Sequence, residues 1–178
     1  MSKKLLITGG CRSGKSRHAL TLARNISGAK FYVATAEALD SEMEERIAKH
    51  QQERGEGWET YEEPTDLVKV LKQLENRSGV LVLDCLTLWL SNLLIKDYSQ
   101  EYILKEAVAL MDRCEQMQCQ LIFVTNEVGA GIVPENKLAR DFRDIVGAVN
   151  QLVAQQCDEV VHMVSGIPVT IKPRSANQ

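Results

Sequence analysis

The stretch GGCRSGKS, residues 9–16, constrains the fold of this chain more than any other feature of its sequence. It follows a short apolar run at residues 5–8 and precedes a helical pattern, which predicts a strand, a phosphate-binding loop and a helix. The glycines let successive backbone N–H groups point at phosphate oxygens, and the helix N-terminus adds its positive end. Lys15 is then expected to reach the β- and γ-phosphates, and the Ser16 hydroxyl to ligate Mg²⁺. The loop therefore predicts a site for a nucleoside triphosphate.

The length and charge of the chain favour one ordinary globular domain. At 178 residues the chain can bury a substantial core, and we expect a single domain over residues 1–173 followed by a polar tail, residues 174–178. A net charge of −3 gives no sign of a nucleic-acid-binding surface. The apolar runs are of strand length, so we expect neither a signal peptide nor a membrane-spanning helix.

Cysteine usage favours a reducing compartment. The five cysteines are an odd number and include no C-x-x-C pair. They therefore predict neither a disulfide framework nor a structural zinc site, and a cytoplasmic location is the simplest expectation.

Strand and helix patterns alternate along the rest of the chain. Buried-type strands are predicted at residues 31–36, 79–84 and 121–127, an edge hairpin at 159–164 and 168–172, and helices at about 16–29, 40–54, 65–76, 86–94, 98–118 and 134–156. Residues 55–64 suit either a mobile loop or a short edge strand. A capping box from Ser41 to Glu44 and Pro134 at a first helical position are the expected starts of two helices. The order predicts an α/β domain with a mostly parallel sheet, whose ligands gather at the carboxyl ends of its strands.

The helix at residues 40–54 carries Arg46, His50 and Arg54 on one stripe, one turn apart. A solvated helix with a structural histidine is the plainer interpretation. The two flanking cations nevertheless favour a neutral, nucleophilic imidazole, and they could also hold phosphate oxygens. The stripe therefore suits a histidine that attacks a phosphorus atom.

Asp84 ends the apolar run at residues 79–84, which is the arrangement of a Walker B strand. Paired with the phosphate loop, this carboxylate is expected to order Mg²⁺ together with Ser16. The next helix, residues 86–94, is apolar nearly all round and should be buried in the core or against another subunit. Trp89 is accordingly expected in the core or an interface rather than stacked on a cofactor.

The long helix at residues 134–156 presents a polar face next to a strand-end loop. Such faces are usually only solvated, but the position of this one leaves a substrate contact open. The residues on this face are Arg140, Asp141, Arg143, Asp144 and Asn150.

Taken together, these motifs resemble the bifunctional adenosylcobinamide kinase/adenosylcobinamide-phosphate guanylyltransferase family of cobalamin biosynthesis, over nearly the whole chain. The matching segments are GGCRSGKS (9–16), YVAT (32–35), RIAKHQQER (46–54), W-x-T-x-E (58–62), LVLDCLTLWLSNLL (81–94), VTNEVGAGIVPEN (124–136), FRDIVGAVNQ (142–151) and VSGIPVTIK (164–172). The phosphate loop is generic, whereas the 124–136 segment together with the histidine helix is specific. Some members have Glu where this chain has Asp84, which should preserve a metal or nucleotide contact with a shorter reach.

The resemblance implies a RecA-like P-loop fold, a trimeric assembly and two consecutive reactions. ATP or GTP would phosphorylate the hydroxyl of adenosylcobinamide, and GTP would then convert the product to adenosylcobinamide-GDP and pyrophosphate through a guanylylated His50, with Lys15 as the second catalytic residue. The nucleotide contacts that it implies are Gly9, Gly10, Cys11, Arg12, Ser13, Gly14, Lys15, Ser16, Ala34, Thr35, Ala36, Gln51, Gln52, Glu53, Arg54, Glu62 and Asp84.

Two other functions are compatible with the phosphate loop. A P-loop kinase for another small alcohol would use only Lys15, Ser16 and Asp84, and it predicts that His50→Ala keeps full activity. A RecA-type regulatory module would hydrolyse nucleotide slowly in response to a macromolecule. The lack of a basic surface signature disfavours this second alternative.

Overall fold

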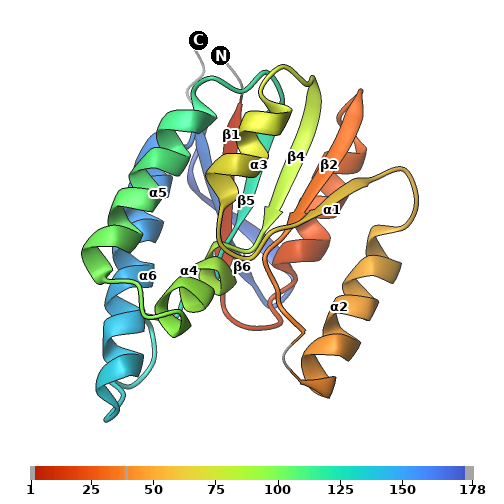
Figure 1. Cartoon of the computed structure of the whole chain (residues 1–178). Helices are drawn as coiled ribbons and strands as arrows, with labels where there is room; N and C mark the ends of the chain where they lie inside the picture. Colours follow the sequence, from red (N-terminus) through yellow and green to blue (C-terminus); the bar gives the residue numbers. More distant parts are fainter. Residues whose placement is uncertain (1–2, 39, 175–178) are drawn as a thin grey trace.

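A computed structural model of the chain describes residues 3–38 and 40–174, in which helices cover both faces of one sheet (Figure 1). The strands are β1 (Lys4–Gly9), β2 (Ala29–Ala34), β3 (Glu59–Glu62), β4 (Gly79–Asp84), β5 (Gln120–Val124), β6 (Glu159–Val164) and β7 (Ile167–Lys172). The helices are α1 (Lys15–Arg24), α2 (Ser41–Arg54), α3 (Leu67–Leu74), α4 (Leu86–Ile95), α5 (Gln100–Cys114) and α6 (Lys137–Gln156). Most of the predicted polar tail lies outside the described residues.

The seven-stranded sheet has the order β3-β2-β4-β5-β1-β6-β7. Every neighbouring pair is parallel except β6 and β7, so the predicted parallel sheet with a C-terminal edge hairpin is confirmed. Of the two interpretations of residues 55–64, the short edge strand is correct, because β3 pairs with β2. Ile7, Val124 and Asp84 are in register across β1, β5 and β4, so β4 and β5 end at one level and β1 continues two residues further, to Gly9.

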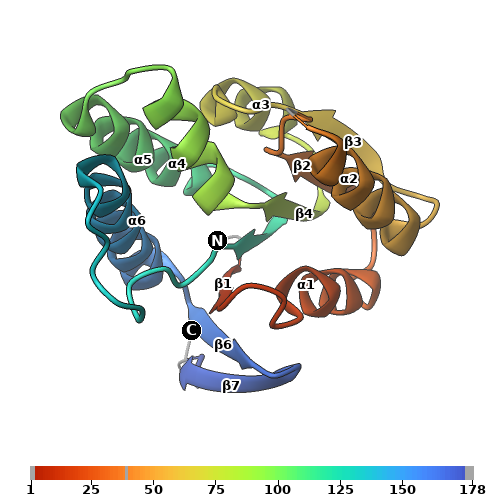
Figure 2. The same cartoon turned by 90° about the horizontal axis from the view of Figure 1, so that it is seen from below.

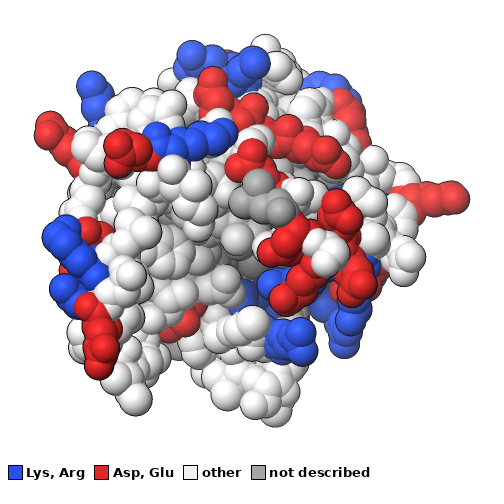
Figure 3. Space-filling view, turned by 60° about the horizontal axis from the view of Figure 1, so that its bottom comes forward, with Lys and Arg blue, Asp and Glu red and all other residues white. Residues whose placement is uncertain are grey.

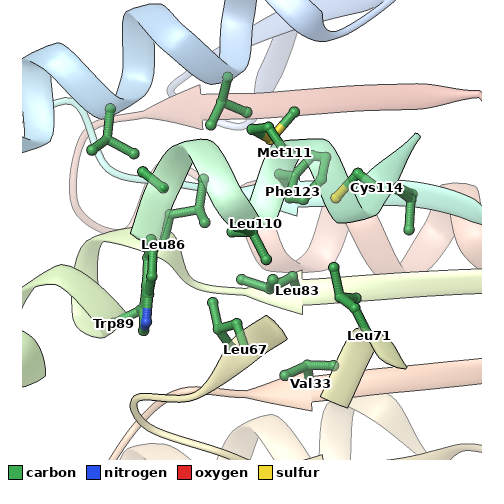
Figure 4. Packing of buried hydrophobic residues seen from close by; sticks show 14 of the residues in the cluster. Val33, Leu67, Leu71, Leu83, Leu86, Trp89, Leu110, Met111, Cys114 and Phe123 are labelled. Carbon is green, nitrogen blue, oxygen red and sulfur yellow. The ribbon is translucent and has the colours of Figure 1, made fainter. Parts of the chain in front are cut away.

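Helix α1 covers one face of the sheet, and α3, α4, α5 and α6 cover the other (Figure 2). The larger core lies under the second group, and Figure 4 shows side chains from strands and helices meeting there. Trp89 on α4 is 1% exposed and its Nε1 donates to the Thr65 carbonyl oxygen at 2.8 Å. Leu86, Leu90 and Leu93 are likewise buried, so α4 belongs to the core of its own chain and offers little surface to another subunit.

Several predicted helix ends are wrong. The N-cap of α2 is Asp40 rather than Ser41, since the Asp40 carboxylate accepts a hydrogen bond from Met43 N at 2.8 Å. Helix α6 begins after Asn136, whose side chain accepts from Ala139 N, so Pro134 does not occupy its first position. Helix α1 ends at Arg24, several residues earlier than predicted. None of the described helices is long and apolar enough to cross a membrane.

Candidate functional site

The phosphate loop joins β1 to α1 in a conformation that requires glycine at two positions. Gly9 has a φ of +150°, and a Cβ there would lie 2.6 Å from the Met163 carbonyl oxygen. Gly14, with a φ of +94°, is the N-cap of α1. Gly166 N, in the turn between β6 and β7, donates to the Ser13 carbonyl oxygen at 3.0 Å. The hairpin therefore supports the loop from behind.

Lys15 is folded into this loop. Its side chain is buried, and Nζ donates to the Gly10 carbonyl oxygen at 2.6 Å. Burial lowers the pKa of Lys15, although Cys85 and Asp84 act in the opposite direction. An anionic ligand such as a phosphate group stabilises a positive charge that has so little solvent around it.

Asp84 receives a hydrogen bond that the sequence analysis missed. The Tyr32 hydroxyl donates to Asp84 Oδ2 at 2.9 Å, because Ala34 of β2 is in register with Asp84 of β4. Burial, reinforced by the neighbouring Asp84, raises the pKa of Tyr32 well above its ordinary value. The phenol therefore stays protonated and orients the carboxylate. A tyrosine two residues before the end of a buried strand was the available signal.

The side chain of Thr35, a predicted nucleotide contact, lies inside the protein at the carboxyl edge of the sheet and is not exposed on its surface. It is fully buried, and its hydroxyl both accepts from Cys85 N and donates to the Cys85 carbonyl oxygen, each at 2.8 Å. Asn92 of α4 donates to the Thr35 carbonyl oxygen at 2.7 Å. The Thr35 hydroxyl is thus occupied in holding the backbone that follows Asp84.

A pocket of about 550 Å³ opens between α2 and the carboxyl ends of β2, β3 and β4. Figure 3 shows this edge as a hollow with charged side chains on one side and mostly uncharged surface on the other. The predicted site residues that line the pocket are Ala34, Ala36, Arg46, His50, Gln51, Arg54, Glu62 and Asp84. The phosphate loop, Thr35, Gln52 and Glu53 do not line it. The predicted site therefore has two parts, which meet at Asp84, whose carboxylate lies close enough to Lys15 to act on its pKa in the upward direction.

The histidine stripe of α2 faces this pocket. The Arg54 guanidinium lies 4.3 Å above the centre of the Tyr32 ring and is largely buried. His50 Nδ1 is also buried, and it has no hydrogen-bond partner in the part of the chain that the structure describes. The three stripe residues line the pocket together, as the helical spacing predicted.

Helix α2 is attached to α1 at its C-terminal end. Arg24 Nη2 donates to the Glu53 carbonyl oxygen at 2.6 Å, and the Glu53 carboxylate lies 3.7 Å from Arg17 Nη2. The side chain of Glu53 thus contacts α1 instead of the pocket, and Gln52 is exposed to solvent. Arg54 is the buried residue of α2. The rest of the helix lies over the pocket and packs only loosely against the domain.

Ser16 and Asp84 have the oxygen donors that Mg²⁺ prefers, and they lie at the neighbouring ends of α1 and β4. Among residues 3–38 and 40–174, no group of three or more His, Cys, Asp or Glu side chains could hold a metal ion. A magnesium ion would therefore need phosphate oxygens of the nucleotide to complete its coordination, as is usual for this metal.

The polar face of α6 is largely engaged with the chain itself. Arg140 donates to the Pro134 carbonyl oxygen at 3.0 Å, and Arg143 donates to the Gly129 carbonyl oxygen. Asn150 is bonded to Thr125 and to the backbone of Asn126. These contacts fix the loop between β5 and α6, so the face is not purely solvated. Arg143 Nη1 is buried and has no hydrogen-bond partner among the described residues, and a substrate contact of this face stays a prediction.

Comparison with known proteins identifies a family over almost the whole chain. A family model described as "Cobinamide kinase / cobinamide phosphate guanyltransferase" matches residues 5–171. The bifunctional adenosylcobalamin biosynthesis protein CobU of Escherichia coli (strain K12) is 43% identical over 180 residues, covering 94% of this chain and 99% of the relative. The bifunctional adenosylcobalamin biosynthesis protein CobP of Pseudomonas aeruginosa is 42% identical over 167 residues, covering 94% and 96%.

Solved structures similar to this one share its fold at low sequence identity. An ATPase from the type III secretion system of pathogenic bacteria has a TM-score of 0.59 at 12% identity; the alignment covers 92% of this chain and 52% of the ATPase. A protein of Pyrococcus horikoshii OT3 also has a TM-score of 0.59, at 8% identity, with 98% and 88% coverage. These similarities concern the fold alone, and they support the predicted α/β architecture with a mostly parallel sheet.

Proposed function

The chain belongs to the cobinamide kinase/cobinamide phosphate guanyltransferase family, and we propose that it performs both of its transfers at the carboxyl edge of its sheet, with His50 as the nucleophile of the second. It is a bifunctional enzyme of cobalamin biosynthesis. It phosphorylates adenosylcobinamide with ATP or GTP and then transfers GMP from GTP to adenosylcobinamide phosphate. Its corrinoid substrate is thus consumed as an alcohol and released as an ester of GDP.

In the first transfer, the hydroxyl oxygen of the corrinoid attacks the γ-phosphorus of the nucleotide. The bond between that phosphorus and the β–γ bridging oxygen breaks, the nucleoside diphosphate leaves, and the hydroxyl proton passes to water. We assign the γ-phosphate to the loop of residues 9–16, where Lys15 and the backbone N–H groups offset the charge of the transferred group. The buried ammonium of Lys15 supports this assignment.

In the second transfer, a neutral imidazole nitrogen of His50 attacks the α-phosphorus of GTP. A phosphorus–nitrogen bond forms, the α–β bridging bond breaks and pyrophosphate leaves, with Lys15 stabilising its charge. The phosphate oxygen of the corrinoid then attacks the same phosphorus, and the phosphorus–nitrogen bond breaks to restore His50. Arg46 and Arg54, which share the pocket with His50, are suited to hold the phosphate oxygens during both steps.

Ser16 and Asp84 are the proposed ligands of Mg²⁺. With the nucleotide bound, the ion would neutralise part of the phosphate charge. Tyr32 would keep the Asp84 carboxylate in place through its hydrogen bond. The proposed nucleotide contacts are those that the family resemblance implies. Thr35 and Glu53 would contribute indirectly, by holding the backbone near them in place.

A trimer in a reducing cytoplasm is the proposed setting of the enzyme. All five cysteines are free, which suits that compartment. Exposed apolar side chains, which are suited to subunit contacts, lie on the hairpin, before α6 and in its first turn, whereas the exposed apolar side chain of α4 is Ile95 at its end. Those on the hairpin and around the start of α6 are Ile132, Val133, Leu138, Val164, Ile167, Val169 and Ile171. Light scattering coupled to gel filtration would test the trimer directly.

The observation that carries the proposal for the second transfer is the position of His50 in one pocket with Arg54 and Asp84. The test is to incubate the enzyme with Mg²⁺ and GTP labelled at the α-phosphate, denature it, and look for acid-labile, alkali-stable label on the chain. We expect label on the wild-type chain and none on His50→Ala. Lys49→Ala, one position along the helix and exposed, is the matched control and should be labelled like wild type. An unlabelled wild-type chain that still binds GTP would refute the covalent mechanism and favour a simple P-loop kinase.

A further inference from the structure

Asn126 lies between Thr125 and Glu127, whose backbones extend the pairing of β5 with β1. Beyond the end of β5, Thr125 N donates to the Ile7 carbonyl oxygen and Glu127 N donates to the Gly9 carbonyl oxygen, each at 3.0 Å. The parallel ladder therefore continues to the start of the phosphate loop, and Asn126 lies beside Gly9. Because β5 lies between β1 and β4 in the sheet, Asn126 lies between the strand that leads to Lys15 and the strand that ends in Asp84.

The backbone of Asn126 is held from the opposite face of the sheet. Its N–H donates to Thr87 Oγ1 at 2.7 Å, and its carbonyl oxygen accepts from Asn150 Nδ2 at 3.1 Å. The Thr125 hydroxyl joins these two side chains: it is hydrogen-bonded to Thr87 Oγ1 at 3.1 Å and donates to Asn150 Oδ1 at 2.8 Å. Both threonines are buried, so side chains from α4, from the segment directly after β5 and from α6 form a network that fixes one backbone position.

The side chain of Asn126 points to the face where the nucleotide site lies. Side chains alternate along a strand, and Thr125 faces α4 and α6. Asn126 therefore faces α1, on the same side as Val124, which packs in the α1 core. Asp84 shares this side, because Val82 packs in the same core. Within the described ranges the half-buried amide of Asn126 has no hydrogen-bond partner, although its backbone has two.

We propose that the Asn126 amide is a catalytic group of the phosphoryl-transfer step, which contacts the γ-phosphoryl group between Lys15 and Asp84. This inference rests on the proposed function. An amide can donate to a phosphoryl oxygen and accept from the attacking hydroxyl, which suits the transfer of the γ-phosphorus to an alcohol oxygen with loss of the nucleoside diphosphate and of one proton to water. Thr87 and Asn150 are positioning residues, since they act through the backbone of Asn126.

The two half-reactions should respond differently to the loss of this amide. In phosphorylation, the γ-phosphoryl group is the transferred group, and its charge redistributes in the transition state. In guanylylation of His50, the breaking bond is the α–β bridge, and the γ-phosphate leaves as part of pyrophosphate. A contact to the γ-phosphate is then nearly equal in the ground and transition states, so it affects binding more than the rate.

The test compares both half-reactions in Asn126→Ala and in the isosteric Asn126→Asp, which replaces the donor by a carboxylate. At saturating nucleotide, kcat for phosphorylation of cobinamide should fall about 100-fold or more in both variants, as for loss of one donor to a developing charge. The rate of labelling of His50 by α-labelled GTP should change less than about threefold, because it needs no stabilisation of the γ-group. Asn76→Ala, an exposed asparagine before β4, is the matched control and should leave both rates unchanged.

Retained labelling of His50 also shows that each variant is folded and binds GTP. A parallel fall of both rates, or a kcat for phosphorylation within about fivefold of wild type, would overturn the inference, because one missing donor should cost far more. A wild-type chain that neither phosphorylates cobinamide nor becomes labelled would refute the proposed function, and this inference with it.

Discussion

Replacing Thr35 with valine tests how the chain holds the end of β4. Valine has nearly the shape of threonine but offers no hydrogen bond. In the wild-type chain the buried Thr35 hydroxyl satisfies both the N–H and the carbonyl oxygen of Cys85, each at 2.8 Å. Thr35→Val therefore leaves the Cys85 N–H without a partner where water does not reach, and it leaves the Cys85 carbonyl oxygen with one donor, Trp89 N at 3.2 Å.

The expected loss of stability follows from these two groups. The orphaned N–H costs about 1–3 kcal/mol, and the hydrogen bond that the carbonyl oxygen loses costs about 0.5–1.5 kcal/mol. The methyl group that valine adds recovers about 0.8 kcal/mol. The net effect is a fall of about 1–4 kcal/mol in the free energy of unfolding. A loss of about 2 kcal/mol would lower Tm by about 4–8 °C in a domain of this size.

Urea denaturation followed by tryptophan fluorescence measures this loss. The titration is run without nucleotide, because a ligand that binds only the folded state adds stability of its own. Thr35→Ser is the matched control: it keeps the hydroxyl and loses one methyl group, at a cost of about 1 kcal/mol. A Thr35→Val variant as stable as wild type, or more stable than Thr35→Ser, would show that the hydroxyl does not hold the Cys85 backbone.

Two further predictions concern the phosphate loop. Gly9→Ala would put a Cβ 2.6 Å from the Met163 carbonyl oxygen at a φ of +150°, so the loop must shift and the Kd for GTP should rise at least about tenfold, or 1.4 kcal/mol. Calorimetric titration measures it, and Gly147→Ala, with open space around it, should bind GTP like wild type. Burial lowers the pKa of Lys15 from 10.5, so between the two values the unfolded chain binds more protons and stability should rise with pH. Urea titrations across that window should show a flatter rise for Lys15→Met, and an identical slope would contradict the burial argument.

The parts of the site that the sequence predicted are encoded within short segments. The phosphate loop, the acid at the end of β4 and the stripe on α2 each depend on spacing within a few residues. The Tyr32–Asp84 hydrogen bond could not be predicted in this way, because it joins residues 52 positions apart and depends on the register of β2 against β4. The commitment of the Thr35 hydroxyl to Cys85 has the same origin.

Other questions could not be decided from the sequence where two outcomes use the same residues. An all-round apolar helix can bury its side chains in its own core or against another subunit, and only the placement of α5 and α6 beside α4 decides between them. Pro134 and Asn136 both suit the start of a helix. Asn136 is the observed cap, and Arg140, one turn into α6, holds the Pro134 carbonyl oxygen outside the helix.

The position of β1 in the sheet has a consequence for synthesis on the ribosome. Its neighbours are β5 and β6, which are translated long after residues 4–9. At about 5–20 residues per second, the wait for these partners lasts on the order of ten seconds. During that time the apolar strand β1 has no partner strand at either edge, and the β6–β7 turn that supports the phosphate loop is not yet present. Nucleotide binding can therefore stabilise the folded chain only near the end of translation. Chaperones that hold unfolded chains should bind the nascent N-terminal half.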